Sequence, residues 1–249
     1  GIAVEAVLSV ARKVGEDYLV DLDDIMVEKK PGESMSDTKL LKGVVLDKEV
    51  VHSGMPKRVE KAKIALLESA LEIKKTEFDT KINIERPEQM SSFLREEEDM
   101  LKAMVEKIVS SGANVVFCQK GIDDMVQHFL ARKGVLAVQR VKESDVKKLA
   151  MATSGKAITN LEELSRSDLG FAEVVEERKI GDDKMTFIEG CKNPRSVAIL
   201  IRGADKRFLE EAERSVHDAL CVVRDVVQVP KIVAGGGAPE MEVAKALRG

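Results

Sequence analysis

The sequence is poor in aromatic residues, in long apolar runs and in excess positive charge. It contains no tryptophan, one tyrosine and seven phenylalanines among 249 residues, so aliphatic side chains must fill its core. No apolar run approaches the roughly 18 residues of a membrane span, and the chain does not open on a signal-peptide pattern. Its formal net charge of −4 gives no reason to expect a nucleic acid or an anionic membrane as a partner. These absences favour a globular cytoplasmic protein.

Cysteine and histidine are scarce as well. The three cysteines are Cys118, Cys191 and Cys221. They form no Cys-x-x-Cys pair, and we interpret them as small buried residues with no histidine at ligand spacing. A disulfide is not expected in a cytoplasmic chain. The three histidines, which are scattered along the sequence, are His52, His128 and His217. The sequence therefore predicts neither a metal site nor a covalent catalyst.

Both ends of the sequence are predicted to be helical. Apolar residues recur at helical spacing from Val4 to Val14, directly after Gly1, and a second helix is predicted to start at Pro239. A helix that starts at residue 2 leaves no room for an N-cap residue. Because natural domains more often end in exposed, mobile tails, we expect this chain to be a piece of a longer protein.

The middle of the sequence alternates between short apolar strands and helices. Strands are predicted at 115–118 and 135–138, and helices at 123–133 and 144–153. Such alternation is typical of βαβ units with parallel strands. Further strands are predicted at 43–51, 63–68 and 197–201. A hairpin around Gly181 is predicted to join strands at 172–178 and 185–189.

The longest predicted helix begins at Pro87 and ends at Gly112. Its apolar stripe either packs into the core or, because it is rich in methionine, forms an adaptable contact surface. The first half, around Met90, Phe93 and Leu94, is bounded by a loop on one side and acidic residues on the other. This half could protrude from the domain.

A further helix, capped by Asp205, is predicted through Val227. Asp218 lies off its apolar stripe, and by spacing alone it is an ordinary solvated acid. Beyond this helix, a strand at 232–234 is predicted to lead into Gly235–Gly237 and a helix start. Glycines allow close backbone approach, and free N–H groups at a helix start attract phosphate. The stretch matches neither Gly-x-Gly-x-x-Gly nor a Walker loop, so a tight structural turn and a nucleotide contact both remain open.

Six stretches, in the same order and spread over nearly the whole chain, resemble archaeal group II chaperonins, the thermosome family. They are Gly43–His52 (GVVLDKEVVH), Met55–Ile64 (MPKRVEKAKI), Gln119–Met125 (QKGIDDM), Gly181–Met185 (GDDKM), Glu189–Pro194 (EGCKNP) and Gly235–Glu240 (GGGAPE). Each is short, but the ordered set is specific. The resemblance implies an α/β fold, in which an apical domain is inserted into a mainly helical intermediate domain. The apical domain would have a β core flanked by helices, and a helical protrusion.

The resemblance also implies domain boundaries. The implied parts are residues 1–43 and 202–234 as two strips of the intermediate domain, residues 44–201 as the apical substrate-binding domain, and residues 235–249 as the start of the return to an equatorial domain. The helical protrusion, at about residues 74–111, corresponds to a built-in lid. Its candidate lid residues are Met90, Phe93 and Leu94.

The resemblance assigns roles to single residues as well. Asp218 corresponds to the aspartate that orients the attacking water in ATP hydrolysis. Gly235, Gly236 and Gly237 correspond to the loop that borders the nucleotide. The helix at 123–133 corresponds to the wall that binds unfolded polypeptide, and the candidates there are Met125, Gln127, His128, Phe129 and Arg132. A mixed apolar and polar surface suits many clients, because non-native chains expose apolar side chains.

The expected function is therefore that of a chaperone fragment. It would bind unfolded polypeptide and supply the lid of an ATP-dependent folding chamber, with ATP and magnesium as cofactors and sister subunits of a double ring as partners of the full-length protein. The Gly-Asp-Gly-Thr-Thr phosphate loop and the second Asp-Gly phosphate motif of the family are absent. We therefore expect no cofactor on this chain alone, and no ATPase activity from it. Ser53 stands where proline is expected, which changes a local turn.

Two alternatives to the chaperone hypothesis stay open. The first is an autonomous nucleotide-binding protein that uses Gly235–Gly237. The second is an inert structural fragment.

Overall fold

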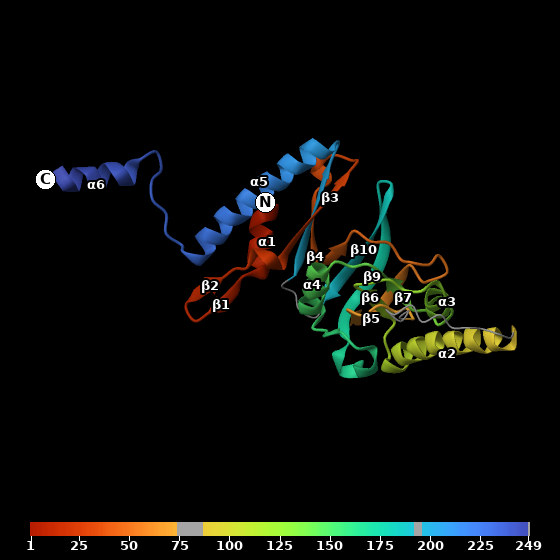
Figure 1. Ribbon diagram of the computed structural model, residues 1–249. Helices are drawn as coiled ribbons and strands as arrows, with labels where there is room; N and C mark the ends of the chain where they lie inside the picture. The colour runs from red at the N-terminus through yellow and green to blue at the C-terminus, as the bar shows by residue number, and fades with distance from the viewer. Residues whose placement is uncertain (74–86, 192–195, 249) are drawn as a thin grey trace.

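The computed structural model describes residues 1–73, 87–191 and 196–248 (Figure 1). Among these residues, nine strands form one long sheet and two more form a separate hairpin. The path of the sheet is β3 (Ile25–Pro31), β11 (Val197–Gly203), β4 (Lys39–Leu46), β10 (Asp183–Cys191), β9 (Gly170–Ile180), β5 (Arg58–Leu67), β6 (Val115–Cys118) and β7 (Leu136–Val138), and β8 (Ala157–Ile158) pairs with β5 off this path. The hairpin consists of β1 (Arg12–Val14) and β2 (Asp17–Leu19).

Six helices accompany the strands in the described part of the chain. They are α1 (Ile2–Val10), α2 (Pro87–Ser111), α3 (Asp124–Arg132), α4 (Glu143–Thr153), α5 (Lys206–Gln228) and α6 (Ala238–Arg248). α1 and α5 pack on β3 and β11, whereas α2 and α3 pack together at the other end of the sheet. α6 stands apart at the end of an extended segment (Figure 1). None of the described helices is long and apolar enough to cross a membrane.

In the described part of the chain, buried apolar residues form two hydrophobic cores, and the larger one surrounds β5, β6 and β7. Ile64 in β5 pairs with Val115 in β6, which pairs with Leu136 in β7, all in parallel register. α3 and α4 are the helices of this alternation, and they bury residues such as Leu130. This parallel arrangement was predicted from the alternation of apolar strands with helices, and it is confirmed. The predicted hairpin is confirmed too, because β9 and β10 run antiparallel around Gly181.

The smaller core lies between β3, β11, α1 and α5. Successive residues of a strand point to opposite faces of the sheet. In β11, Ile199 accordingly packs in the smaller core, while its neighbours Ala198 and Leu200 pack in the larger one. The carboxylate of Asp205 accepts a hydrogen bond from the backbone N–H of Phe208 at 2.9 Å, so α5 begins at its predicted N-cap.

β4 joins the two parts of the sheet. Its first half pairs with β11 at Lys39–Lys42, and its second half pairs with β10 at Gly43–Leu46. At the change of partner, Gly43 has a φ of 140°, and a Cβ atom there would lie 2.0 Å from the carbonyl oxygen of Ile188. Only glycine permits this close approach of two backbones.

Two predicted elements near the N-terminus have other boundaries. The first helix ends at Val10 instead of continuing toward Gly15, because residues 12–14 pair with β2 and leave Val14 exposed. The strand predicted at 43–51 begins at Lys39 and ends at Leu46. It stops there because the chain turns away, and the backbone N–H of Val50 donates to the carboxylate of Glu177 at 2.8 Å.

The strand predicted at 232–234 is absent, since residues 231–235 have no regular structure. Ile232 is 86 % exposed. A strand needs a partner for its backbone N–H and C=O groups, and Figure 1 shows this segment standing away from the sheet. The predicted helix that follows it is confirmed as α6.

Candidate functional site

α3 presents a mixed apolar and charged face at the end of the larger core. Asp123 caps the helix, since its carboxylate accepts from the backbone N–H of Met125 at 2.9 Å. Helical spacing then buries Val126 and Leu130 on one face. On the other face, Met125 is 43 % exposed, and His128 and Arg132 are exposed as well. The structure thus places these three predicted residues at the surface.

Gln127 differs from the other predicted contact residues, because it is only 8 % exposed. Its amide Nε2 donates to the carbonyl of Ile122 at 2.7 Å and to the carboxylate of Asp124 at 3.3 Å. These bonds satisfy a buried polar group and fix the start of α3. Gln127 therefore supports the face from within and offers little surface to a ligand.

A groove of about 300 Å³ runs between α2 and α3. It is lined by Lys102, Val105 and Glu106 of α2 and by Phe129, Arg132 and Lys133 at the end of α3. The ammonium group of Lys102 lies 5.9 Å from the centre of the Phe129 ring, within the range of a cation–π contact. Lys102 also pairs with Glu98 at 2.8 Å, and this hydrogen bond raises the pKa of Lys102. The half-buried Phe129 thus sits among charged side chains.

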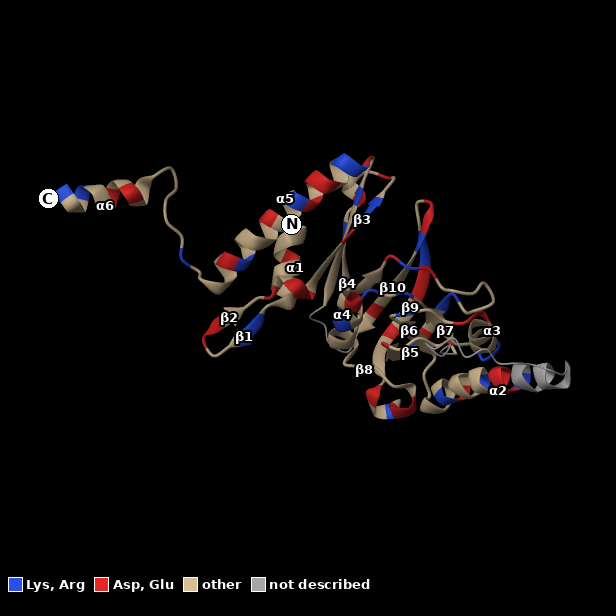
Figure 2. Cartoon of the chain, in the orientation of Figure 1, with Lys and Arg blue, Asp and Glu red and all other residues tan. Residues whose placement is uncertain are grey.

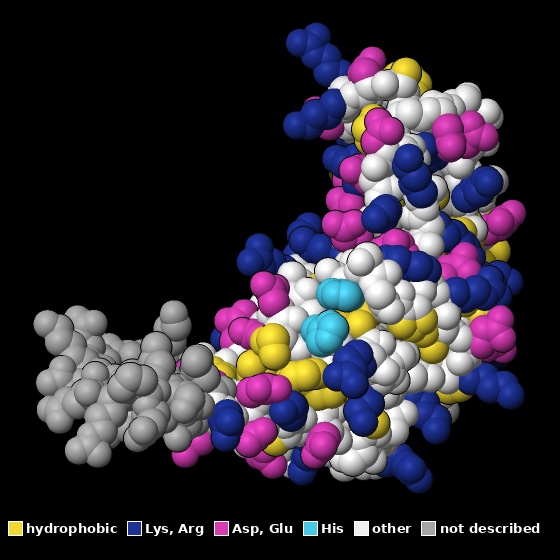
Figure 3. Space-filling model, turned by 90° about the vertical axis from the view of Figure 1, so that its right-hand side faces the viewer, with side chains coloured by type: hydrophobic (Ala, Val, Ile, Leu, Met, Phe, Trp, Pro, Cys, Tyr) yellow, Lys and Arg dark blue, Asp and Glu magenta, His cyan; other side chains and the backbone are white. Residues whose placement is uncertain are grey.

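A loop that the sequence did not assign to the site borders α3. It comprises residues 47–57, between β4 and β5, and its His52 ring lies 6.1 Å from the ring of His128. Figure 3 shows two adjacent histidine side chains among hydrophobic ones on the face that carries α3. The Nδ1 atom of His52 accepts from the backbone N–H of Gly54 at 3.0 Å, which holds the ring in place. Nothing in the spacing of His52 and His128 in the sequence indicates this contact.

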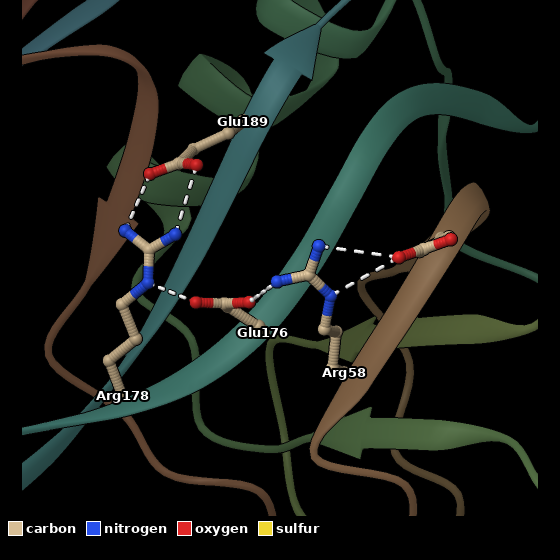
Figure 4. Close-up of polar contacts among 5 residues, drawn as sticks. Arg58, Glu176, Arg178 and Glu189 are labelled. Carbon is tan, nitrogen blue, oxygen red and sulfur yellow. Dashed lines mark hydrogen bonds and ion pairs between the residues drawn. The ribbon is translucent and has the colours of Figure 1, made fainter.

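An ion-pair network crosses three strands of the larger sheet (Figure 4). Arg58 of β5 donates to Glu176 of β9 at 2.6 Å, and Arg178 of β9 donates to both Glu176 and Glu189 of β10. The guanidinium of Arg178 also lies 4.7 Å from the centre of the Phe187 ring. The hydrogen bond from Arg178 is the main reason why the pKa of Glu176 is lowered. Every charge in this network has a partner within it, so we interpret it as a brace for the sheet.

Asp218 lies on the solvent-exposed side of α5. Charged residues of both signs are interspersed along this helix (Figure 2). The glycines predicted to border a nucleotide are exposed too, and Gly236 and Gly237 have φ values of 71° and 79° just before α6. No atom beyond its chain neighbours lies within 4 Å of the Cβ position of Gly235 or of Gly236. The segment that carries these glycines leads to α6, which stands apart from the sheet (Figure 1).

The candidate lid residues belong to the first half of α2. Residues 74–86 lie outside the described residues, and so do the side chains of Met90, Phe93 and Leu94. The backbone from Pro87 belongs to α2, so the predicted long helix is confirmed.

Comparison with known proteins agrees with this geometry. The model of the TCP-1/cpn60 chaperonin family matches residues 1–249. The thermosome subunit beta of Thermococcus kodakarensis is 60 % identical over 243 residues, which are 98 % of this chain and 44 % of that protein. The thermosome subunit alpha of Archaeoglobus fulgidus is 57 % identical over 247 residues, which are 99 % of this chain and 45 % of that protein.

A solved structure shows the same fold. It is an open-state monomer of a group II chaperonin from Methanococcoides burtonii, with a TM-score of 0.83 and 36 % identity, and the match covers 98 % of this chain and 55 % of that chain. The protein thus spans less than half the length of the two thermosome subunits. It belongs to the TCP-1/cpn60 chaperonin family.

Proposed function

We propose that this chain is the polypeptide-binding part of a group II chaperonin subunit, a protein that folds other proteins in an ATP-driven chamber. The observation that carries the proposal is the face of α3. Met125, His128 and Arg132 are exposed there, and the half-buried Phe129 opens into the groove beside α2. A surface that combines apolar, cationic and imidazole groups can hold many different unfolded segments. Family membership supports the same conclusion.

The binding face extends beyond the predicted helix in this proposal. The loop at 47–57 stands beside α3 through the contact between His52 and His128, so a bound segment would touch both elements. Gln127 acts as a support for the face and not as a contact, because its amide is used internally.

The domain layout is part of the same proposal. Residues 44–201 form the apical domain, residues 1–43 and 202–234 form the two strips of the intermediate domain, and residues 235–249 lead to an equatorial domain. The segment at 74–111 supplies the lid, with Met90, Phe93 and Leu94 at its contacts. Sister subunits in a double ring are the proposed partners of the whole protein.

In the whole protein, we assign Asp218 to the step of ATP hydrolysis in which a carboxylate orients the attacking water. Its exposure on α5 leaves the carboxylate free to meet a nucleotide held elsewhere in the protein. ATP with magnesium would supply the energy of the folding cycle. We expect neither ATP binding nor hydrolysis by this chain alone, because its sequence lacks the Gly-Asp-Gly-Thr-Thr phosphate loop and the second Asp-Gly phosphate motif of the family.

Light scattering of an aggregating client tests the binding proposal directly. The chain, without ATP, should reduce the scattering of a chemically denatured client in a concentration-dependent way. Replacing Met125 and Phe129 by serine should remove most of this effect. Replacing the exposed Met35, which lies outside α3 in the short turn before β4, is the matched control and should leave it unchanged. An unchanged scattering trace at molar excess of the wild-type chain would contradict the proposal.

A calorimetric titration with Mg-ATP separates the chaperone proposal from an autonomous nucleotide-binding protein. We expect no heat of binding. Micromolar binding that is lost on replacing Gly236 by valine would establish the nucleotide-binding alternative instead. A chain that neither binds ATP nor protects the client would be an inert fragment.

A further inference from the structure

His217 and Cys221 form a pair that the spacing of the sequence should have revealed. They are four residues apart on α5, so they project from the same face of the helix. His217 is exposed and Cys221 is half-buried. The sequence was interpreted as having no histidine at ligand spacing from a cysteine, and the structure shows that this interpretation was wrong.

The distance within this pair has a specific chemical meaning. The Sγ atom of Cys221 lies 3.6 Å from the Nε2 atom of His217. A tetrahedral zinc ion binds sulfur at about 2.3 Å and imidazole nitrogen at about 2.0–2.1 Å, which puts the two donor atoms about 3.5 Å apart. The two donors are therefore already at the separation that one tetrahedral ion requires. Without an ion, a hydrogen bond between the thiol and the imidazole accounts for the contact. A bound ion would take the place of the proton that the two atoms share.

The surroundings of the pair leave room for an ion. His217 and Cys221 line a hollow of about 440 Å³ together with Arg224 and residues 19–23. Two acidic residues of that stretch, Asp21 and Asp23, are among those that line the hollow. They favour a cation there. The positive charge of Arg224 disfavours a bound cation. Its guanidinium, however, donates to Asp225 at 2.8 and 2.9 Å, and this carboxylate offsets part of the charge.

The protein supplies two ligands rather than a closed cage. The described residues contain no group of three or more histidine, cysteine, aspartate or glutamate side chains placed to hold a metal ion. Water molecules must complete the coordination, as they do where a metal site keeps open positions. An open site of this kind exchanges its ion readily.

We propose that His217 and Cys221 form a bidentate site for a thiophilic divalent cation, with zinc or cadmium as the fitting class. On binding, the sulfur–hydrogen bond of Cys221 breaks, a metal–sulfur bond forms and the proton goes to solvent, with no change of oxidation state. A thiolate and an imidazole select such ions over magnesium, which prefers oxygen ligands. The site is thus separate from the magnesium that accompanies ATP, and it does not depend on the role proposed for Asp218.

Cadmium titration of the reduced chain, followed by the ultraviolet thiolate-to-cadmium charge-transfer band, tests this site. One equivalent should produce the band. Cys221→Ser should abolish it. His217→Ala should weaken binding by about 100-fold, because the second donor no longer acts intramolecularly. A large excess of magnesium should leave the band unchanged.

Cys191→Ser is the matched control. Burial raises the pKa of the Cys191 thiol to about 11, so this second half-buried cysteine stays protonated at neutral pH and competes poorly for the ion. The control should titrate like the wild type. A missing band in the wild type, or equal affinity in His217→Ala and the wild type, would overturn the chelate.

Alkylation provides a second measurement that is independent of the absorbance. Zinc should slow the reaction of Cys221 with iodoacetamide, read from the mass of its peptide, and a chelator should restore the rate. The peptide that contains Cys191 should react at the same rate with and without zinc. Equal alkylation of Cys221 in the presence and absence of zinc would contradict the proposal.

Discussion

The two cores of the molecule differ in how far their own elements cover them. In the larger core, all four residues of β6 are buried between flanking strands and helices. In the smaller core, α5 buries Leu209, Ala212 and Leu220, but the same helix leaves Val222 62 % exposed. Apolar burial is the main stabilising term of a fold, at about 25 cal/mol per Å². The larger core should therefore be the more stable unit, and the smaller core should open first.

The largest expected effect comes from the centre of the larger core. Phe117 is fully buried in β6, so Phe117→Ala should lower the free energy of unfolding by about 3–5 kcal/mol. Urea unfolding gives the total loss. Hydrogen exchange should show faster opening in β5, β6 and β7, and little change in α1 and α5.

A surface substitution on α5 sets the scale for this loss. Val222→Ala should change the free energy of unfolding by no more than about 0.5 kcal/mol, because the side chain is exposed. If Phe117→Ala accelerated exchange equally in both cores, the two would be one cooperative unit and the contrast between them would fail.

The next largest effect is expected at Gly43, where β4 changes its partner strand from β11 to β10. Gly43→Ala combines a forbidden φ with a collision against the carbonyl oxygen of Ile188, and we expect a loss of at least about 2 kcal/mol. Gly15→Ala is the matched control, because Gly15 also has a positive φ but its Cβ position is open. Thermal unfolding should rank Gly43→Ala well below Gly15→Ala. Equal losses would mean that strain in φ, and not the close approach, limits β4.

Elements whose signals are local could be predicted from the sequence. The N-cap at Asp205 and the strand at 115–118 were predicted at the positions where the structure has them. Both depend on residues close together in the chain. The prediction of a strand at 232–234 was wrong because a strand also depends on a distant partner. Apolar residues show strand propensity, but they do not show whether a partner strand is present.

The candidate site also has features that the sequence predicted and features that depend on contacts between distant segments. The family resemblance named Met125, Gln127 and Arg132 together as contact residues. The structure exposes Met125 and Arg132, whereas the amide of Gln127 is used internally, which the resemblance did not show. The contact between His52 and His128 depends on how the loop at 47–57 folds back over α3. Contacts between distant segments depend on the register of the sheet and on the path of the loops. Neither can be predicted from the residue pattern of a single sequence.

A smaller loss of stability is expected from removing the N-cap of α5, and this substitution tests the smaller core. Asp205→Ala removes the carboxylate that accepts from the N–H of Phe208, and we expect a loss of about 1 kcal/mol. Asp205→Asn keeps an acceptor and should lose much less. Hydrogen exchange should localise the change to the first turn of α5. A loss spread evenly over both cores would show that the smaller core does not open independently.

The smallest effect concerns the brace on the larger sheet, and it depends on pH. Because the pKa of Glu176 is lowered from its ordinary 4.5, the charged carboxylate stabilises the fold above about pH 4.5. This contribution is lost as the pH falls through the lowered value in the folded state. Glu176→Gln should therefore cost up to about 1 kcal/mol at neutral pH, the range of exposed ion pairs.

The difference between Glu176→Gln and the wild type should shrink as the pH falls below about 4.5, where the wild-type carboxylate also loses its charge. Urea unfolding at a series of pH values gives this difference directly. Subtracting the two curves removes the contributions of carboxylates that lie outside the network, because both proteins share them. A difference that stays constant between neutral and acidic pH would show that Glu176 acts through packing, and that the ion pairs of the brace contribute nothing measurable to the larger core.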